Sequence, residues 1–302
     1  MESFVNTIDL LGDKATVDAI VSSTIIEFND NVLTHIGEYA FAGSAALMSV
    51  NLPNVTSVGD RAFLRCPSLT SVDLANITSI GVNVFYDCNA LTSVNMPNVT
   101  SIGSEAFSYC HALTNVNIPK LTSIGNQAFS TCKALTSIDL SKVTSVGKGA
   151  FRGCESLTNV DLPNVTSVVE NMFSNCKALT SVNMPNATSI GSNAFYYCQS
   201  LTNVNTSDIT SIDSSAFYEC RALTSIDLPN VTSIGSSAFG WCVKLTSVRL
   251  PATPPTLSNT NAFYIVPTTC VFYIPTGSLT EYQNATNWSS LTSKYSFVEE
   301  DR

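Results

Sequence analysis

The sequence predicts a solenoid of short parallel strands, and three observations support this fold class. Nine units of 22 residues follow one another without an insertion or deletion. Equal residues recur at equal places in each unit, which is the signature of a stacked repeat array. The 302 residues are 44% hydrophobic and 12% charged, a composition that suits a folded chain with a large core. The units begin at Leu47, Leu69, Leu91, Leu113, Leu135, Leu157, Leu179, Leu201 and Leu223.

The first half of each unit predicts strand structure. A typical unit reads L-T-S-V-N-L-P-N-V-T-S-I-G-x-x-A-F-x-x-C-x-A. Positions 4 and 6 are apolar and alternate with polar residues as in a half-buried strand, and proline at position 7 ends that strand in six of the nine units. Positions 9 and 12, such as Val99 and Ile102, add a second apolar pair. We therefore expect one short parallel strand per unit, followed by a second inward-facing pair.

The second half of each unit predicts a turn. Glycine at position 13 turns the chain in seven units, and Val169 and Asp213 replace it in the other two. If this glycine uses a positive φ, the unit with Val169 is expected to be strained or differently turned. The A-F-x-x-C segment places two inward groups three residues apart, which favours one helical or 3₁₀ turn over a strand.

A cysteine occupies position 20 of every unit. At the strand spacing of roughly 4.7–4.9 Å the cysteines would form a buried column, where a free thiol behaves as a small apolar residue. Occasional disulfides and a metal remain alternatives. Parallel Cα–Cβ vectors hold neighbouring Cβ atoms slightly too far apart for a disulfide, and single rungs do not supply the converging ligands of a zinc site. Cys270 is out of register, and we expect it to be structural as well. The column comprises Cys66, Cys88, Cys110, Cys132, Cys154, Cys176, Cys198, Cys220 and Cys242.

The ends of the array predict caps, because each repeat buries its faces only against its neighbours. We expect an N-terminal cap with a short helix over residues 1–24 and a solenoid over 25–250, of which 47–244 are full repeats. Residues 251–302 are expected to form a C-terminal cap of a strand and a short helix. There, Ser278 and Glu281 have the spacing of a capping box, and Leu279, Tyr282 and Trp288 are expected to cover the end of the core.

The repeat unit L-x-x-V-x-L-P-x-V-x-x-I-G-x-x-A-F-x-x-C resembles the BspA-type (Treponema pallidum-type) leucine-rich repeat over residues 25 to about 250. This resemblance implies a right-handed leucine-rich-repeat solenoid that is curved, with its parallel sheet on the concave side. It also implies a surface protein that adheres to host or matrix proteins or to other cells. The tail "IPTGSLTEYQNATNWSSL" resembles the segment that closes the last turn of such proteins.

The charge pattern excludes some classes of partner. Residues 47–250 carry twelve acidic and eleven basic residues, so the net charge of −9 comes from the ends of the chain. No basic stripe is present for a phosphate backbone, and we expect no nucleic-acid partner. Residues 1–21 lack the features of a secretory signal, and no segment has the roughly 20 apolar residues of a membrane-spanning helix. We therefore expect no membrane insertion.

Catalytic and metal-binding motifs are not apparent in the sequence. His35 and His111 are the two histidines, and both stand in repeat positions without a supporting nucleophile motif. No phosphate loop, HExxH motif or EF-hand loop occurs. We expect neither an enzyme nor a cofactor, and no metal site.

One candidate binding surface is a polar ladder at position 5 of the strand. It would serve as a recognition surface or a cation groove, or it would simply be a solvated strand face. Single aspartates among asparagines do not supply the six to eight oxygen ligands of a calcium site. The residues are Asn51, Asp73, Asn95, Asn117, Asp139, Asp161, Asn183, Asn205 and Asp227.

The second candidate is an aromatic edge at positions 18 and 19, which vary most between units and are therefore expected to face outward. Tyrosine and tryptophan are enriched where proteins contact partners. Alternatively, the rings only cover the core of the neighbouring turn. The residues are Tyr86, Tyr109, Tyr196, Tyr197, Tyr218 and Trp241.

These features predict a non-enzymatic protein-binding or adhesion module, displayed on a bacterial cell surface, that contacts a protein or a cell-surface glycan. The alternative is a phage or prophage tail-associated protein that recognises the host, for which no leader is required. A cytosolic scaffold would also fit the reduced cysteines. The extracellular, cell-surface or virion location is expected from the resemblance rather than from a signal in these residues.

Overall fold

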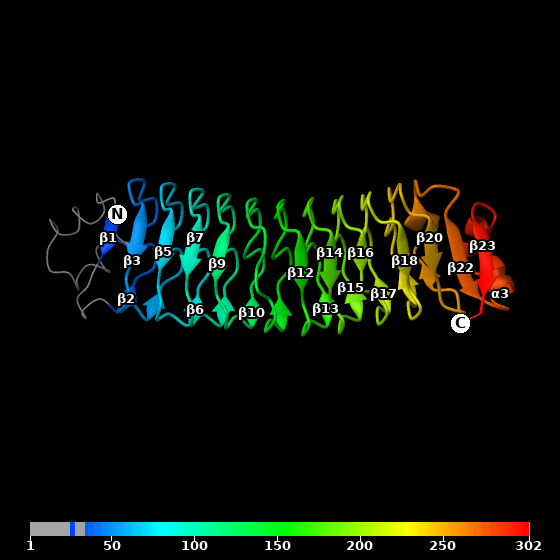
Figure 1. Cartoon of the computed structure of the whole chain (residues 1–302), viewed down its shortest axis with the longest axis horizontal. Helices are drawn as coiled ribbons and strands as arrows, with labels where there is room; N and C mark the ends of the chain where they lie inside the picture. Colours follow the sequence, from blue (N-terminus) through cyan, green and yellow to red (C-terminus); the bar gives the residue numbers. More distant parts are fainter. Residues whose placement is uncertain (1–24, 28–33, 302) are drawn as a thin grey trace. The chain divides into compact units, whose positions relative to one another are not determined.

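The computed structural model describes residues 25–27 and 34–301. These residues form two compact units, one ending at Leu157 and the other beginning at Thr158. In each unit the chain winds through successive turns that place short strands side by side (Figure 1). The predicted solenoid of parallel strands is confirmed. The predicted N-terminal cap over residues 1–24 lies outside the described residues.

The first unit contains two sets of parallel strands. Strands from positions 3–5 pair in the order β3-β5-β7-β9, with β1 added before β3, and strands from positions 11–12 pair as β2-β4 and β6-β8-β10-β11. The register advances by one repeat, so that Val72 pairs with Val50 and with Val94. The strands are β1 (Ile25–Glu27), β2 (His35–Ile36), β3 (Ser49–Asn51), β4 (Ser57–Val58), β5 (Ser71–Asp73), β6 (Ser79–Ile80), β7 (Ser93–Asn95), β8 (Ser101–Ile102), β9 (Asn115–Asn117), β10 (Ser123–Ile124) and β11 (Ser145–Val146).

The second unit repeats this pattern and ends in a different structure. Its sheets have the orders β12-β14-β16, β13-β15-β17-β19-β21 and β18-β20-β22-β23. The elements are β12 (Asn159–Asp161), β13 (Ser167–Val168), β14 (Ser181–Asn183), β15 (Ser189–Ile190), β16 (Asn203–Val204), β17 (Ser211–Ile212), β18 (Ser225–Asp227), β19 (Ser233–Ile234), β20 (Ser247–Arg249), β21 (Thr256–Leu257), the 3₁₀ helix η1 (Thr260–Phe263), β22 (Val271–Pro275), α3 (Leu279–Asn284), α4 (Trp288–Thr292) and β23 (Ser296–Glu300).

The core of each unit is a set of columns of identical residues. Six phenylalanine rings stack from Phe41 to Phe151 in the first unit, with centroids 5.2–5.6 Å apart. Five stack from Phe173 to Phe263 in the second, at 5.2–5.7 Å. Almost all of these rings are fully buried. The 22-residue period, which holds for every step except the last one from Phe239 to Phe263, returns the same side chain to the same place at each turn.

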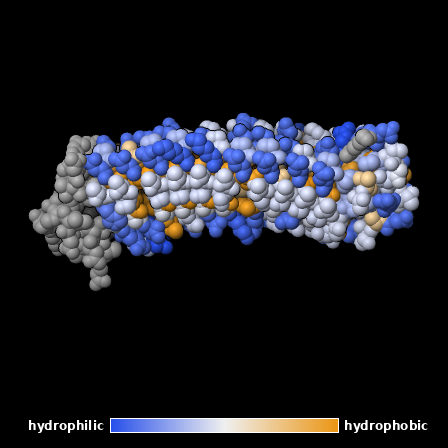
Figure 2. All heavy atoms as spheres, turned by 90° about the horizontal axis from the view of Figure 1, so that it is seen from below, coloured by the Kyte–Doolittle hydropathy of each residue, from blue (hydrophilic) through white to orange (hydrophobic). Residues whose placement is uncertain are grey.

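Threonine hydroxyls connect the turns on the outside of the strands. At position 2, Thr92 Oγ1 donates to Thr70 O at 2.9 Å, and at position 10, Thr122 Oγ1 donates to Thr100 O at 3.0 Å. The face in Figure 2 accordingly shows hydrophobic residues as separate spots among pale and hydrophilic ones. The repeated threonines are therefore part of the scaffold.

The position-13 glycine has a different role from the one expected. None of these glycines has a positive φ; the left-handed residues stand at positions 15 and 19 of the turns, as Arg61 (φ 58°) and Arg65 (φ 55°) illustrate. A Cβ on Gly125 would lie 2.6 Å from the carbonyl carbon of Gly103. In the turns that have glycine, close approach of the neighbouring backbone excludes a Cβ, and the expected left-handed strain at Val169 does not arise because this position does not use a positive φ.

The A-F-x-x-C segment forms successive hydrogen-bonded turns, and a 3₁₀ helix occurs only at η1 among the described repeats. Its left-handed residues turn alternate N–H groups toward the following turn. Arg61 N, Phe63 N and Arg65 N donate at 2.8–2.9 Å to the carbonyls of Val82, Val84 and Tyr86. This side of each turn is therefore connected by its own ladder of backbone hydrogen bonds.

The segment after residue 251 covers the end of the second unit. Trp288 and Tyr282 are fully buried, while Leu279 is half-buried. The Trp288 indole lies 6.0 Å from the Phe263 ring and donates to Pro255 O at 2.6 Å. Trp288 and Phe272, whose ring lies 5.0 Å from that of Phe263, thus cover the last ring of the phenylalanine stack, and Tyr282 packs against Trp288 at 5.1 Å.

The expected capping box at α3 is wrong. Ser278 makes no side-chain capping bond. Instead, Glu299 Oε1 of β23 accepts hydrogen bonds from Gly277 N at 2.9 Å and Leu279 N at 3.0 Å. A carboxylate far along the chain satisfies the first free N–H groups of the helix.

Candidate functional site

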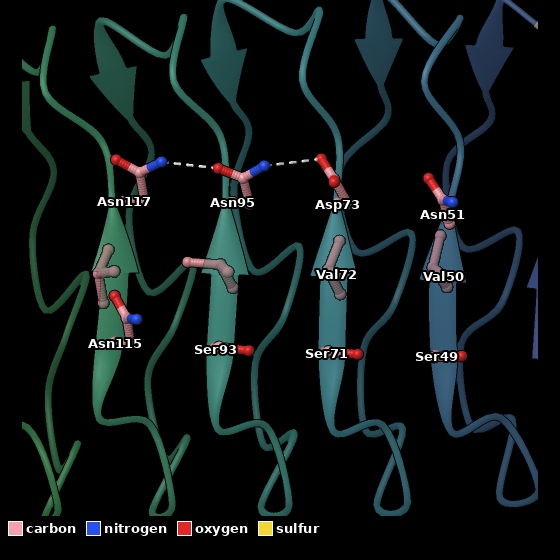
Figure 3. Close-up of a pocket in the computed structure, with 12 residues that line it drawn as sticks. Ser49, Val50, Asn51, Ser71, Val72, Asp73, Ser93, Asn95, Asn115 and Asn117 are labelled. Atoms are coloured by element: carbon pink, nitrogen blue, oxygen red, sulfur yellow. Dashed lines mark hydrogen bonds between the residues drawn. The ribbon is translucent and has the colours of Figure 1, made fainter.

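The strand face of the first unit holds a hydrogen-bonded row of position-5 side chains. Asn117 Nδ2 donates to Asn95 Oδ1 at 2.7 Å, and Asn95 Nδ2 donates to Asp73 Oδ1 at 3.1 Å (Figure 3). Asn51 lies on the adjoining strand β3. The structure therefore brings these four predicted residues together on neighbouring strands.

This row borders an open groove of about 710 Å³. Three rows of side chains line it, with serine or asparagine at position 3, valine at position 4, and asparagine or aspartate at position 5. The valines of the first three strands are each 2% exposed, and Val116 is half-buried. The lining residues are Ser49, Val50, Asn51, Ser71, Val72, Asp73, Ser93, Val94, Asn95, Asn115, Val116 and Asn117.

Two predicted ladder residues fold back on their own chain. Asp139 accepts from Ser141 N at 3.0 Å, and Asn205 accepts from Ser207 N at 3.2 Å. Serine replaces the proline of position 7 in these two turns. The serine side chains also bond to these residues, as Ser207 Oγ donates to Asn205 Oδ1 at 3.1 Å, whereas Asp73, which is followed by Ala75, stays in the ladder. The side-chain bond to Ser141 lowers the pKa of Asp139.

In the second unit the ladder is shorter. Asn183 Nδ2 donates to Asp161 Oδ1 at 2.8 Å, and Asp227 lies beyond the turn in which Asn205 has left the row. A smaller hollow of about 350 Å³ lies between Thr202–Ser207 and Ser225–Asp227. The strand face is therefore less regular here than in the first unit.

Beyond Asp227 the position-5 column contains residues that the sequence reasoning did not single out. Arg249 pairs in register with Asp227 and with Tyr273. Its guanidinium lies 5.0 Å from the Tyr273 ring centroid and 3.1 Å from Glu300 Oε1. This group connects the last strands of the unit.

The predicted aromatic edge divides between the two units. In the first, Tyr86 and Tyr109 meet edge to face at 5.5 Å, and the Tyr109 ring lies 6.1 Å from that of His111. Tyr109 is 41% exposed. Burial, reinforced by nearby Tyr109, raises the pKa of Tyr86.

In the second unit three tyrosines form a cluster. Tyr196 and Tyr218 stack at 5.3 Å with their planes 12° apart, and Tyr197 lies 4.6 Å from Tyr196. Tyr218 leans over Gly240, where a Cβ would lie 2.8 Å from its Cδ2 atom. Glycine at this position therefore makes room for the ring.

An ion pair between a buried glutamate and an exposed arginine lies beside these rings. Glu219 is 5% exposed and bonds to Arg221, whose side chain is half-exposed. Burial first, and the Glu219 carboxylate second, raise the pKa of Tyr218. Because Arg221 balances the carboxylate, the aromatic cluster has no unpaired charge from this pair.

Sequence reasoning missed three exposed members of this edge. Tyr264 is 49% exposed, and Val243 and Ile265 are each 40% exposed. Trp241 N donates to Tyr264 O at 2.8 Å, which joins the half-buried Trp241 to the next turn. The Ala262-Phe263 pair before Tyr264 repeats the Ala-Phe pair of the other units and could have identified Tyr264 as a member of this edge. It was missed because Phe263 follows Phe239 by 24 residues rather than 22.

The cysteine column is buried, and its thiols are free. Each thiol with a recorded bond donates to a phenylalanine carbonyl of the preceding turn; Cys110 Sγ, for example, lies 3.1 Å from Phe85 O. Burial raises the pKa of Cys154 and of Cys270 to about 12. These groups are thus poor nucleophiles at neutral pH, and Cys270 shares their burial despite its different register.

Other reactive groups do not assemble into a recognisable centre in the described part of the chain. His35 Nδ1 lies 2.6 Å from Ser57 Oγ in an exposed pair, and no carboxylate of residues 34–301 bonds to this ring. Across the described ranges, no group of three or more His, Cys, Asp or Glu residues is placed to hold a metal ion. No helix among them has the length and apolar character to cross a membrane.

Comparison with known proteins gives matches along the whole array. The family described as BspA type Leucine rich repeat region matches residues 18–136, 78–202, 122–246 and 188–293. A leucine-rich repeat protein from Bacteroides ovatus is 25% identical, with a TM-score of 0.72 over 89% of this chain and 76% of that one. A leucine rich cell surface protein from Faecalibacterium prausnitzii is 29% identical, with a TM-score of 0.55 over 88% and 80%. No curated protein matches.

Proposed function

Because the chain belongs to the BspA-type leucine-rich repeat family, we propose that it is a non-enzymatic binding protein of a bacterial cell surface. In this proposal it holds a protein partner through the aromatic edge of its second unit. The family match supports a binding role, since such repeats typically act as binding modules. The relative from Faecalibacterium prausnitzii, a cell surface protein by name, supports the location.

The exposed apolar side chains of the second unit carry the proposal. Six large apolar residues of the described chain are at least 40% exposed, and three of them, Val243, Tyr264 and Ile265, lie on this edge. The tyrosine cluster and Trp241 adjoin them. Tyrosine and tryptophan are enriched among the residues that dominate protein interfaces, and exposed apolar groups gain free energy when a partner covers them.

The ring geometry favours a protein over a glycan at this edge. Tyr196 and Tyr218 stack on each other, and Tyr218 also covers Gly240. Each of these two rings therefore has a face covered by the other ring, and Tyr218 also lies against the backbone at Gly240. A sugar ring would need an open aromatic face, whereas apolar side chains of a protein can pack against ring edges, Val243 and Ile265.

The test is a binding screen against isolated host-cell and bacterial surface proteins. The variant carries Tyr196→Ser, Tyr197→Ser, Tyr218→Ser and Trp241→Ser. A matched control carries Tyr86→Ser and Tyr109→Ser in the first unit, which removes the same kind of ring. Circular dichroism establishes that both variants remain folded.

We expect the wild-type protein and the first-unit control to bind the same partner with similar affinity. The second-unit variant is expected to bind at least tenfold more weakly, because its interface loses several dominant rings. Equal binding by all three proteins would contradict the proposed contact surface. Turnover of a bound partner, abolished by changing His35 or His111, would contradict the non-enzymatic role.

A further inference from the structure

We infer that the groove on the strand face of the first unit, across strands β3, β5, β7 and β9, is a binding site for a neutral polysaccharide. This site lies apart from the aromatic edge and does not depend on the proposed protein contact. It would give the protein a second ligand of a different chemical class.

The shape of the groove suits an extended polymer. About 710 Å³ of open space crosses four successive strands, and the same three positions line it on each strand (Figure 3). Adjacent strands repeat at about 4.7–4.9 Å, so equivalent polar groups are presented at a constant short interval. A polymer of repeating sugar units laid across the strands would meet similar groups at each step.

The lining chemistry favours a neutral, hydroxyl-rich ligand. Serine hydroxyls and asparagine amides supply the polar groups of both outer rows, and each can donate and accept hydrogen bonds. Asp73 is the one charged residue of the lining, and it already accepts from Asn95. No lysine or arginine lines the groove, so a polyanion would find no charge partner there.

The amides are held in place before any ligand arrives. Asn117 donates to Asn95, which in turn donates to Asp73, so Asn95 is fixed from both sides. Each asparagine amide keeps a second N–H that the ladder does not use. Binding to side chains that are already ordered costs less conformational entropy than binding to mobile ones.

The groove is poorly suited to an extended peptide. Its floor is formed by Val50, Val72 and Val94, each 2% exposed, which leaves no apolar pockets for peptide side chains. Strands β5 and β7 each pair with a neighbour on both sides. Their backbone N–H and C=O groups are therefore unavailable for the strand addition by which many domains bind peptides.

Affinity electrophoresis tests this inference with the full chain. The neutral probes are dextran, a mixed-linkage β-glucan, mannan, xylan and galactan. Polygalacturonate serves as the polyanion and a soluble, extended neutral peptide as the polypeptide probe. The main variant is Asn95→Ala with Asn117→Ala, and Ser93→Phe is a second variant that fills the groove while leaving the ladder side chains present.

The matched control is Asn183→Ala, which removes the same kind of ladder bond outside the groove. The change Asp73→Asn removes the charge but keeps an acceptor. We expect at least one neutral glycan to bind wild type, Asn183→Ala, Asp73→Asn and the aromatic-edge variant alike. The double asparagine variant should bind it at least about tenfold more weakly, as expected for the loss of one or two hydrogen bonds. Ser93→Phe should weaken binding by at least as much, because its ring fills the groove.

Four results would overturn the inference. The first is that no neutral glycan binds, and the second is that polygalacturonate or the peptide binds more strongly than every neutral glycan. The third is that both groove variants bind the glycan as well as wild type does, and the fourth is that Asp73→Asn loses binding. Glycan binding that disappears only in the aromatic-edge variant would move this ligand to the second unit. Melting curves of each variant separate loss of binding from loss of the fold.

Discussion

Replacing Gly125 with alanine tests how closely the turns approach each other. An added Cβ would lie 2.6 Å from both Gly103 C and Ser104 N. Non-bonded carbon atoms prefer about 3.5–4.0 Å, so neighbouring turns would have to separate by about 1 Å. The obstacle is the backbone of residues 103 and 104, and no side chain can move away to relieve it.

The cost follows from the bond that spans the same gap. Gly125 N donates to Ile102 O at 2.8 Å, and a further separation of about 1 Å would take the pair beyond hydrogen-bonding range. Loss of the bond costs about 1 kcal/mol, and overpacking adds about 1–3 kcal/mol. We therefore expect Gly125→Ala to lower the free energy of unfolding by about 2–4 kcal/mol.

Gly149→Asn is the matched control. Gly149 has φ +63° and stands at position 15, where Asn83, Asn171 and Asn193 have φ values of 55–57° in other turns. Asparagine tolerates this conformation, and it also restricts the unfolded chain more than glycine does. The control is expected to change stability by less than about 1 kcal/mol.

Urea unfolding followed by far-ultraviolet circular dichroism measures both changes. If unfolding is not two-state, the midpoint of the first transition is compared instead. Wild-type stability in Gly125→Ala would refute the close-approach explanation. A loss in Gly149→Asn as large as that in Gly125→Ala would refute the assignment of the left-handed conformation to position 15.

Three further predictions concern the helix cap, the thiols and the aromatic edge. Glu299→Ala should lower the free energy of unfolding by about 1 kcal/mol and so lower the thermal midpoint, whereas Ser278→Ala should not. A larger loss in Ser278→Ala than in Glu299→Ala would instead support the capping box. Burial raises the pKa of Cys154 from 9.0 to about 12, so the folded protein holds this thiol's proton more tightly than the unfolded chain does. The contribution of Cys154 to stability is therefore complete below pH 9 and is lost between pH 9 and 12. In urea titrations, the free energy of unfolding should thus decline less steeply with pH in Cys154→Ala than in wild type, by up to about 1.4 kcal/mol per pH unit. An unchanged slope would contradict this. Gly240→Ala should displace Tyr218 and alter near-ultraviolet circular dichroism with little change in stability; an unaltered spectrum would show that the ring does not lean on that glycine.

The 22-residue spacing predicts the fold because the same period determines both the pairing of the strands and the stacking of the core side chains. A 22-residue interval places Val72 beside Val50 and Val94, and it stacks Phe85 on its neighbours at 5.2 Å. Even the longer interval of 24 residues between Phe239 and Phe263 keeps the column, with the rings 5.3 Å apart. Strand pairing and core composition could therefore be read from residue spacing alone.

The backbone of the turns could not be read in the same way. Gly147 and Gly149 are two residues apart, yet the first meets the backbone of the previous turn and the second adopts positive φ. Most left-handed positions hold non-glycine residues such as Glu105 and Trp241, because inter-turn hydrogen bonds outweigh their modest conformational cost. Residue identity alone does not distinguish these two roles.

The candidate surfaces were predicted in part. Asn95 and Asn117 lie in a row as expected, whereas Asp139 and Asn205 leave it and bond to the serine two residues later, through its N–H and its side chain. Position 7 predicts where the strand ends, but the bond of its serine side chain to position 5 does not follow from the sequence pattern. That bond becomes visible only in the structure.

Hydrogen exchange of the protein with a partner recovered from the surface-protein screen tests the proposed function most directly. We predict that binding slows exchange in residues 196–199, 218–221, 240–243 and 264–266, since their backbone lies under the aromatic edge. The same partner should leave residues 49–117 unchanged. Protection confined to residues 49–117, with none in the second unit, would contradict the proposal that the aromatic edge holds the protein partner.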